Sequence, residues 1–241
     1  MPKVVFIVLH YLTYKDTIEC VKSIKNNINY ENYKIVIVDN ASNNGSFEII
    51  TNEYELEEKI FILSNKSNVG FAQGNNIGYQ FAKETLKADF IIIINNDTII
   101  RDSNFIEFII DYHKRYGFHI LGPKIISLQD QCNQNPLEII VDNKRKVLKA
   151  ILKYFILYIA NIIKLEEMYK KIKKIQKVNE EKYRLTQKQD ESILKDVPLH
   201  GACLIFSKEY INNEKNAFYP NTFLFVEEDI LYYICKKKKY N

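Results

Sequence analysis

The stretch Ile91-Ile92-Ile93-Ile94-Asn95-Asn96-Asp97 decides the fold of this chain. Four β-branched residues in a row predict a strand that is covered on both faces, as in a parallel α/β sheet. Two amides and a carboxylate follow where this strand ends. Because ligands of open α/β sheets bind beyond the carboxyl ends of the strands, we expect Asp97 at a binding edge. A capped turn is the alternative, since Asn and Asp are also common turn residues.

Two earlier apolar runs end in polar residues in the same way. The run from Val4 leads to His10 and Tyr11, and the run from Lys34 leads to Asp39. Between them, apolar residues recur at the spacing of one helix face, at Ile18, Val21, Ile24 and Ile28. Strand, helix and strand in this order predict a βαβ unit with a right-handed crossover.

The alternation continues along the chain. We expect a helix over residues 47–54, a strand over 60–63, and a Gly/Asn-rich loop over 68–76 that opens into a helix ending near Lys83. The strand that ends at Asp97 comes next, and residues 204–206 restart a strand. Alternating strands and helices predict a doubly wound α/β sheet.

Five short motifs occur in one order along the chain. They are V-D-N-A-S at 38–42, N-x-G-F-A-x-G-N-N at 68–76, N-N-D at 95–97, H-G-A-C-L-I-F at 200–206 and F-L-F-V-E-E-D-I-L at 223–231. Together they resemble the family 2 glycosyltransferases with the GT-A (nucleotide-diphospho-sugar transferase) fold, close to the bacterial rhamnosyltransferase-like members. The resemblance covers most of the chain outside residues 135–195. It implies a mixed, mainly parallel sheet that is flanked by helices.

One GT-A catalytic domain over residues 1–241 follows from the resemblance. It comprises a nucleotide-binding half over about 1–134, a basic helical insertion over about 137–190 and an acceptor-side segment over about 195–241. The chain ends with Lys236-Lys237-Lys238-Lys239-Tyr240-Asn241, where relatives continue with a further strand and helices, so we expect a truncated C-terminus.

Composition is ordinary for a folded globular protein, with 46% hydrophobic and 27% charged residues. The four cysteines form no C-x-x-C pair, and Cys20 and Cys203 lie in apolar stretches that predict core positions. We expect a reducing cytoplasm, because no signal peptide precedes the first strand and no apolar run reaches the roughly 18–20 residues of a membrane span.

The segment 144–188 carries fourteen Lys or Arg against four Glu, a net charge of +10 in a chain of +4. Its apolar residues recur at helical spacing, which is typical of basic amphipathic helices. It is interpreted as a membrane-surface contact on the inner face of the cell membrane, as a helical insertion that packs on its own domain or on a second subunit of a homo-oligomer, or as a solvated face. No recognised motif supports nucleic-acid binding.

Asp39 is the first candidate for holding a nucleotide. Its carboxylate can accept a hydrogen bond from N3–H of uracil or thymine, which favours a UDP- or dTDP-sugar donor, and the resemblance assigns it the same role. An Asp that starts a turn or caps a helix is the alternative. Tyr11 is placed to stack near the base. Relatives carry Asn where His10 stands, and a structural histidine is the alternative there.

The loop 68–76 contains Gly70 and Gly74, which permit a ligand to approach the backbone closely. Asn75 is a candidate for the ribose or the diphosphate. The full set of predicted nucleotide- and donor-binding residues is His10, Tyr11, Asp39, Asn40, Asn68, Gly70, Asn75, Asn96, Gly201 and Ala202.

Asp97 is the predicted metal ligand. Mg²⁺ uses one or two carboxylates together with phosphate oxygens and water, and Mn²⁺ prefers similar ligands. The family motif is often D-x-D, and Asn95 replaces its first acidic residue. A divalent cation held by a single carboxylate is therefore expected to bind better once the nucleotide is present.

Glu227, Glu228 and Asp229 form the candidate base cluster. Close like charges raise the pKa of one carboxyl group, which suits a general base. Glu228 matches the base position of the family best and Asp229 is the second choice. Favourable interaction with a helix N-terminus is the structural alternative. We expect His200 and Glu227 to line the acceptor or sugar pocket.

The predicted reaction is transfer of a sugar, with inversion, to a hydroxyl of a glycan or lipid-linked acceptor in bacterial cell-surface polysaccharide synthesis. A non-catalytic nucleotide-sugar binding subunit is one alternative. A sugar-phosphate nucleotidyltransferase is another, although His10-Tyr11-Leu12-Thr13 lacks the Gly-rich basic loop that such an enzyme needs after its first strand.

Overall fold

A computed structural model describes residues 1–137 and 193–241 of the chain. The predicted basic segment 144–188 lies outside these residues. Two units are present, one formed by Met1–Pro123 with Pro198–Asn241 and the other by Lys124–Val197. In the described part of the second unit, an isolated bridge pairs Ile126 with Asn133. All the predicted site residues belong to the first unit.

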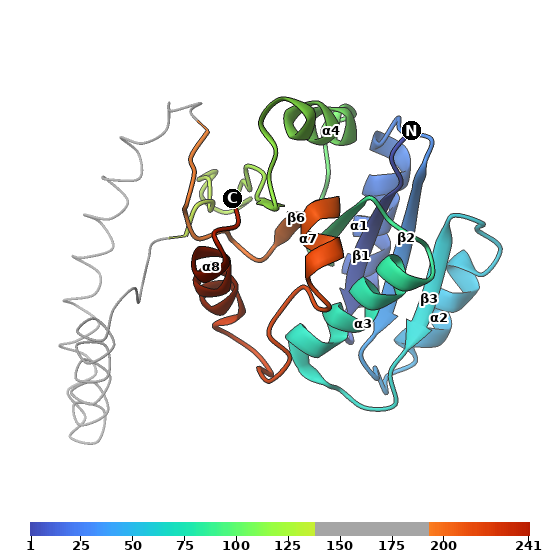
Figure 1. Ribbon diagram of the computed structural model, residues 1–241. Coiled ribbons are helices and arrows are strands. Elements are labelled where there is room, and N and C mark those ends of the chain that lie inside the picture. The colour runs from blue at the N-terminus through green and yellow to red at the C-terminus, as the bar shows by residue number, and fades with distance from the viewer. Residues whose placement is uncertain (138–192) are drawn as a thin grey trace, which may run out of the picture. The chain divides into compact units, whose positions relative to one another are not determined.

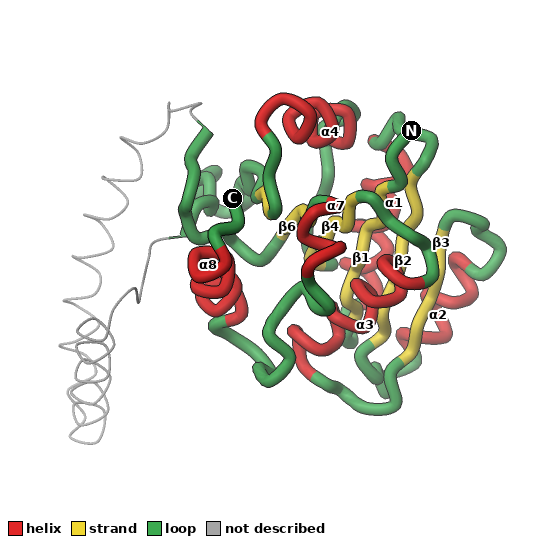
Figure 2. The backbone as a smooth tube through the Cα atoms, in the orientation of Figure 1, coloured by secondary structure: helices red, strands yellow, loops and turns green. Residues whose placement is uncertain are grey.

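A six-stranded sheet forms the centre of the first unit (Figures 1 and 2). Its strands, in sequence order, are β1 (Val4–His10), β2 (Tyr33–Asp39), β3 (Ile60–Ser64), β4 (Phe90–Asn95), β5 (Ile120–Leu121) and β6 (Cys203–Phe206). The spatial order is β3-β2-β1-β4-β6-β5. The first four strands are parallel, and β6 runs antiparallel to both β4 and β5. The sheet is therefore mixed and mainly parallel, as predicted.

Helices cover both faces of this sheet (Figure 1). They are α1 (Tyr14–Asn27), α2 (Ser46–Tyr54), α3 (Gly70–Glu84), α4 (Phe105–Tyr116), α7 (Lys208–Asn213) and α8 (Glu227–Lys238). Helices α3 and α7 pack on one face, and α1 lies behind the sheet in this view. The predicted helices near residues 18–28 and 47–54 are thereby confirmed. The helix that ends near Lys83 is also present, but it begins at Gly70, so most of the predicted loop 68–76 is helical.

The isoleucine run of β4 is buried on both sides, which confirms its prediction as a doubly covered strand. Ile91 and Ile93 belong to the core that packs against Tyr79 of α3. The alternate residues, Ile92 and Ile94, point to the other face and are 0% and 1% exposed. Burial of each Ile contributes roughly 1.5–3 kcal/mol to stability, so this one strand stabilises the packing on both faces of the sheet.

Helix α3 packs closely on the sheet at two of its three glycines, Gly74 and Gly78. A Cβ atom at Gly74 would stand 2.5 Å from Cδ1 of Leu9, and one at Gly78 would stand 2.6 Å from Cγ2 of Ile7. These glycines permit close packing between helix and strand, and they therefore determine the distance between α3 and the sheet.

Cys20 and Cys203 are core residues, as predicted, with 0% and 3% exposure. All four cysteines of the chain are free. Among residues 1–137 and 193–241, no helix has the length and apolar character that a bilayer crossing requires.

Gly70 offers a test of how α3 begins. Its φ is +82°, and an added Cβ would overlap the backbone of Phe223, so Gly70→Ala combines backbone strain with a clash. Gly45 has a similar φ of +79° and open space around it, so Gly45→Ala measures the strain alone. We expect Gly45→Ala to cost about 1–2 kcal/mol, and Gly70→Ala to cost about 1–3 kcal/mol more. Urea unfolding of both variants checks this, and equal losses would contradict it.

Candidate functional site

Three parallel strands end together at the edge that carries the predicted site. The register pairs His10 of β1 with Asp39 of β2, and Leu9 of β1 with Asn95 of β4. Neighbouring strands lie about 4.8 Å apart, so Asp39 and Asn95 stand roughly 10 Å apart along this edge. The edge therefore brings Asp39 and the N-N-D segment into one region, as the strand pattern predicts.

His10 is fully buried and binds protein groups through both of its ring nitrogens. Its Nδ1 lies 2.8 Å from Oγ1 of Thr17, and its Nε2 lies 2.8 Å from Oγ of Ser46. The same Nε2 is 3.9 Å from Oδ1 of Asp39. Burial lowers the pKa of His10 below its ordinary value of 6.5, although the charge of Asp39 acts in the opposite direction. Direct contact with a donor would break these bonds, so the geometry favours the structural alternative for His10.

Asp39 ends β2 and is only 3% exposed. Both carboxylate oxygens accept from the backbone N–H of Ser42, at 3.2 Å each. The turn-forming role is thus real, but two oxygens with about four lone-pair positions leave room for a further donor. Beside it, Tyr11 is 43% exposed at the end of β1, where its ring is free to pack on a planar ligand.

Asn40 joins the end of β2 to the loop before α3. Its Nδ2 donates to Oδ1 of Asn68 at 2.8 Å, and its Oδ1 accepts from Asn65 and from the N–H of Val69, each at 3.1 Å. Asn68 in turn accepts from the N–H of Gly70 at 2.9 Å. The amides of Asn40 and Asn68 are therefore engaged within the protein, and they position this loop.

The space beside Gly70 and Gly74, where we expected a ligand, is occupied by the chain itself. Phe223 fills the position of a Cβ at Gly70, and Leu9 fills that at Gly74. The backbone N–H of Phe71 donates to the carbonyl of Phe223 at 2.7 Å. These glycines serve contacts between distant parts of the chain, which their local sequence does not reveal.

Asn75 and Asn76 of α3 face the protein interior and are each 1% exposed. Asn76 makes two 2.9 Å hydrogen bonds to the backbone of Phe218, one through each polar atom of its amide. Asn75 donates to the carbonyl of Phe71 at 3.0 Å, but its Oδ1 has no partner in the described part of the chain. Asn75 thus keeps an unused acceptor close to the start of α3.

Asp97 lies in the turn that follows β4, which the N–H of Thr98 closes by donating to the carbonyl of Asn95 at 3.1 Å. Asp97 is exposed and, within residues 1–137 and 193–241, has no hydrogen-bond or ion-pair partner. No group of three potential metal ligands occurs in that same part. A lone exposed carboxylate fits a cation that takes its remaining ligands from phosphate and water.

Glu228 reaches the same edge through a close contact with Gly201. An added Cβ at Gly201 would overlap Oε1 of Glu228. The next residue, Ala202, accepts from the N–H of Asn95 at 2.9 Å. This chain of contacts places the first turn of α8 beside the end of β4. His200 precedes the short turn that leads into β6, and its Nδ1 accepts from the N–H of Ala202 at 3.1 Å.

Glu227 is a buried carboxylate, 2% exposed, in the first turn of α8. Burial raises its pKa and the charge of Glu228 adds to this effect, while hydrogen bonds from its own backbone and from Thr222 oppose it. Its Oε1 has no partner among the residues described. Asp229, half-buried, completes the acidic first turn that the sequence predicts for a helix start.

Thr13 and Thr17 were missed by the sequence reasoning. The amide of Asn96 donates to Thr13 Oγ1 at 2.9 Å and to Thr17 Oγ1 at 3.1 Å. Thr17 also contacts His10, so a polar network runs from Asp39 towards the turn that holds Asp97. The sequence does offer a signal for Thr17, because this residue lies four positions before Val21 and hence on the buried face of α1.

Comparison with known proteins now identifies the family. Residues 5–212 match the family model described as glycosyl transferase family 2, so the chain belongs to this family. Family membership and the mixed, mainly parallel sheet flanked by helices confirm the predicted GT-A fold. The rhamnosyltransferase-like specificity remains a prediction.

The chain also resembles individual proteins. It is 31% identical over 93 residues to the glycosyltransferase GlyG of Streptococcus pneumoniae, which covers 39% of this chain and 29% of GlyG. A structure of residues 1–349 of TarS from S. aureus, with UDP, matches this chain with a TM-score of 0.48 at 16% identity. The match covers 58% of this chain and 40% of the TarS chain. The mannosyltransferase PcManGT of Pyrobaculum calidifontis, with GDP-Man and Mn²⁺, has a TM-score of 0.46 at 16% identity, covering 52% and 36%. This chain spans less than half the length of each.

The burial of His10 predicts a pH dependence of stability. Because its pKa is below 6.5 in the folded protein, the unfolded chain binds more protons between that lowered pKa and 6.5. Stability should therefore fall as the pH drops below 6.5, by up to about 1.4 kcal/mol per pH unit. His10→Asn should be less stable at pH 8 and lose less between pH 7 and 5. Urea midpoints of both proteins measure this, and identical pH slopes would disprove the assignment.

Proposed function

We propose that this chain is an inverting, metal-dependent glycosyltransferase that moves a sugar from a UDP- or dTDP-sugar to a hydroxyl of a glycan or lipid-linked acceptor. Membership of glycosyl transferase family 2 supports the class of reaction. The observation that carries the proposal is the contact of Gly201 with Glu228 beside the hydrogen bond between Asn95 and Ala202. It brings a candidate base to the edge that holds Asp97.

The donor nucleotide is placed across the ends of β2, β1 and β4. Asp39 accepts N3–H of the base, and Tyr11 packs on the ring. The roughly 10 Å between the ends of β2 and β4 leaves the diphosphate beside Asp97. Cytosine lacks this N3–H and guanine presents a different edge, so Asp39 selects for uracil or thymine.

Asp97 is the residue that would hold a divalent cation together with the diphosphate. Bound there, Mg²⁺ or Mn²⁺ supplies Lewis-acid stabilisation of the charge that grows on the leaving diphosphate. The hydrogen bonds from Asn96 to Thr13 and Thr17 fix the turn on which Asp97 stands.

Glu228 is the proposed general base. Gly201 leaves room for its carboxylate, and Glu227 lies next to it as a buried group with a raised pKa that binds the acceptor or the sugar. A base that removes the acceptor proton on the side opposite to the leaving diphosphate gives single displacement, and hence inversion. Such a base contributes typically 10²–10⁴-fold to the rate.

Nucleotide binding tests the donor end of the site. A ligand at 100 times its Kd raises stability by about 2.7 kcal/mol. We expect UDP and dTDP with Mn²⁺ to raise the melting temperature, and CDP and GDP to have little effect. Asp97→Asn should remove the gain that Mn²⁺ adds, whereas Asp111→Asn, at an exposed position of α4, should retain it. A rise with all four diphosphates, or an unchanged metal effect in Asp97→Asn, would contradict the assignment.

Turnover tests the base. Glu228→Gln should reduce kcat by about 10²-fold or more while UDP still raises the melting temperature, and Asp229→Asn should have the smaller effect. Gly201→Ala should also lower kcat, because its Cβ displaces the carboxylate of Glu228. Release of UDP from a panel of UDP-sugars with a glycan acceptor is the measurement. Full turnover in Glu228→Gln would exclude this residue as the base.

A further inference from the structure

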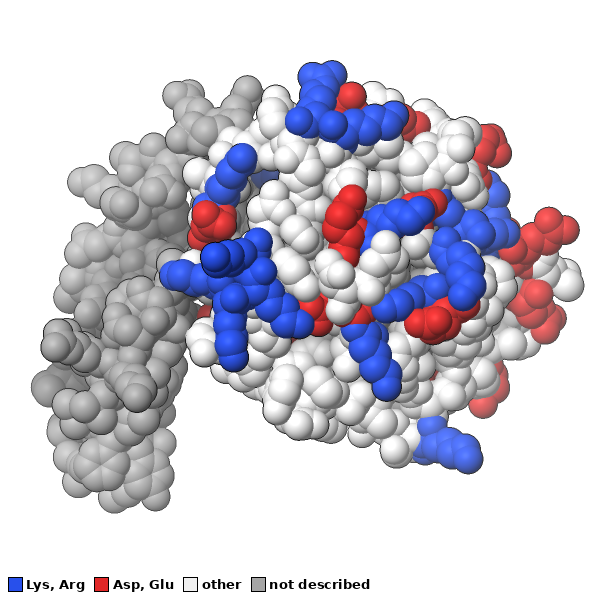
Figure 3. Space-filling view, in the orientation of Figure 1, with Lys and Arg blue, Asp and Glu red and all other residues white. Residues whose placement is uncertain are grey.

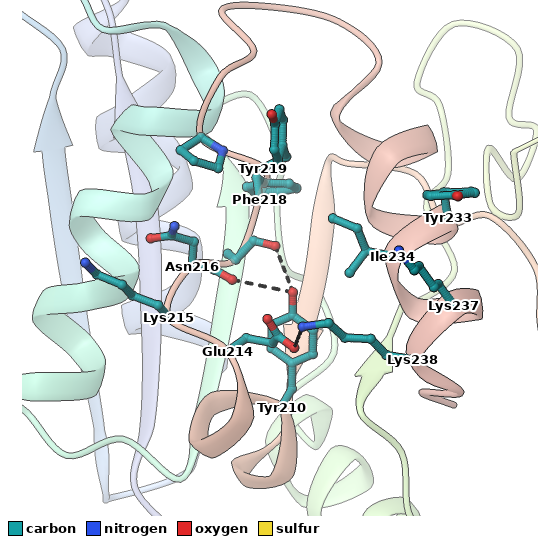
Figure 4. A pocket seen from close by; sticks show the side chains of 12 residues that line it. Tyr210, Glu214, Lys215, Asn216, Phe218, Tyr219, Tyr233, Ile234, Lys237 and Lys238 are labelled. Atoms are coloured by element: carbon teal, nitrogen blue, oxygen red, sulfur yellow. Dashed lines mark hydrogen bonds and ion pairs between the residues drawn. The ribbon is translucent and has the colours of Figure 1, made fainter.

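A pocket outside this edge lies between the segment 214–220 and the second half of α8 (Figure 4). Its volume is about 450 Å³, which is within the range of about 300–1,000 Å³ that is usual for small-molecule sites. Phe218 and Tyr210 form its buried wall, and the hydroxyl of Tyr210 donates to the carbonyl of Ala217 at 3.1 Å. The predicted donor and base residues do not line it.

The wall formed by residues 214–218 is held rigidly on α3. Tyr79 and Lys83 both donate to the carbonyl of Glu214, at 3.3 and 3.0 Å. The two hydrogen bonds between Asn76 and the backbone of Phe218 secure the other end of the segment. The opposite wall is a regular helix, so the pocket is formed without a ligand and binding need not order it.

Two tyrosine rings border the pocket and remain exposed. Tyr219, from the loop, is 43% exposed, and Tyr233, from α8, is 66% exposed. Neither ring is needed to fill the core, and both are available to a ligand. Aromatic rings of this kind suit the C–H face of a sugar, which packs flat on them while its hydroxyl groups stay in water.

The charge of the pocket favours an anion. Its lining contains three lysines and a single acidic residue, Glu214. That carboxylate is already engaged by Lys238 at 2.5 Å and by the hydroxyl of Tyr240 at 2.7 Å. Lys215 and Lys237 have no ion-pair partner in the part of the chain that the structure describes. Figure 3 shows Lys side chains gathered where the C-terminal end of α8 lies in Figure 1.

We propose that this pocket binds a phosphorylated sugar unit of the acceptor, with the tyrosines on the sugar ring and Lys237 on the phosphate. This inference rests on the proposed function and names its acceptor class. Helix α8 carries both Glu228 and the pocket, and Tyr233 and Lys237 follow Glu228 by roughly 8–14 Å along the helix axis. An acceptor seated here would extend along α8 towards the base.

Direct binding of glucose 1-phosphate tests the pocket without any turnover. Titration calorimetry is done on the whole chain with Mn²⁺ and saturating UDP, so that the donor end is occupied. We expect saturable binding that is tighter than that of glucose or of inorganic phosphate alone. Lys237→Gln and Tyr233→Ala should each weaken it by about tenfold.

Two matched surface variants serve as controls. Lys114→Gln and Tyr116→Ala change exposed residues of α4 and should leave the affinity unchanged. Melting temperatures show whether each variant is folded. Unchanged binding in Lys237→Gln and Tyr233→Ala would overturn the proposal, and so would inorganic phosphate binding as tightly as glucose 1-phosphate.

The phosphate has two sources, and competition separates them. A sugar linked to polyprenyl diphosphate in neutral vesicles, or a soluble phosphate-bearing oligosaccharide, should displace glucose 1-phosphate. Binding to phosphatidylglycerol vesicles that depends on Lys237 and Tyr233 but is unaffected by glucose 1-phosphate would instead show a membrane contact and overturn the proposal. If no nucleotide raises stability, the titration is run without UDP, so failure of the donor site and failure of this pocket are distinguishable.

Discussion

The register of β1 between β2 and β4 is the constraint on which the rest of the structure depends. It aligns His10 with Asp39 and Leu9 with Asn95, so the polar ends of three strands meet at one edge. Every residue from Val4 to Val8 is at most 1% exposed. A slip by one residue would exchange the two faces of the strand, and Ile7 would no longer lie beneath Gly78 of α3. Packing of the core thus fixes the geometry of the site.

The second half of the site depends on contacts between distant parts of the chain. Phe71 binds the carbonyl of Phe223, and Asn76 binds the backbone of Phe218, which fastens the C-terminal segment to α3. The segment then enters α8 through Phe225 and Val226, whose φ values are +74° and +62°. Such conformations cost of order 1–3 kcal/mol each, and they concentrate at functional sites. Here they bring Glu227 and Glu228 to the sheet edge, directly after the exposed apolar residues 223–226.

Local patterns were sufficient for the parallel part of the fold. Continuous apolar runs predict doubly covered strands, and β4 is such a strand because Ile91 to Ile94 bury alternately on both faces. The ends of these strands also predict where Asp39 and Asp97 lie. The antiparallel insertion of β6 between β4 and β5 has no comparable signal, since its pairing partners are remote in sequence.

The roles of particular site residues were less predictable for the same reason. Gly70 has the sequence context of a ligand loop, but it serves the approach of Phe223 from the far end of the chain. Asn40 has the context of a ligand contact, yet its amide binds the neighbouring loop. His10 is the clearest case, because only the partners Thr17 and Ser46 reveal that its ring is buried and satisfied.

The central claim is that one sheet edge holds the nucleotide at Asp39, the metal at Asp97 and the base at Glu228. A crystal structure of the chain with UDP and Mn²⁺ tests this most directly. The account predicts N3–H of uracil within hydrogen-bond distance of Asp39, and Mn²⁺ bound by both Asp97 and the diphosphate, with Glu228 facing the space that the donor sugar would occupy. Uracil held by other residues, or Mn²⁺ bound away from Asp97, would contradict it.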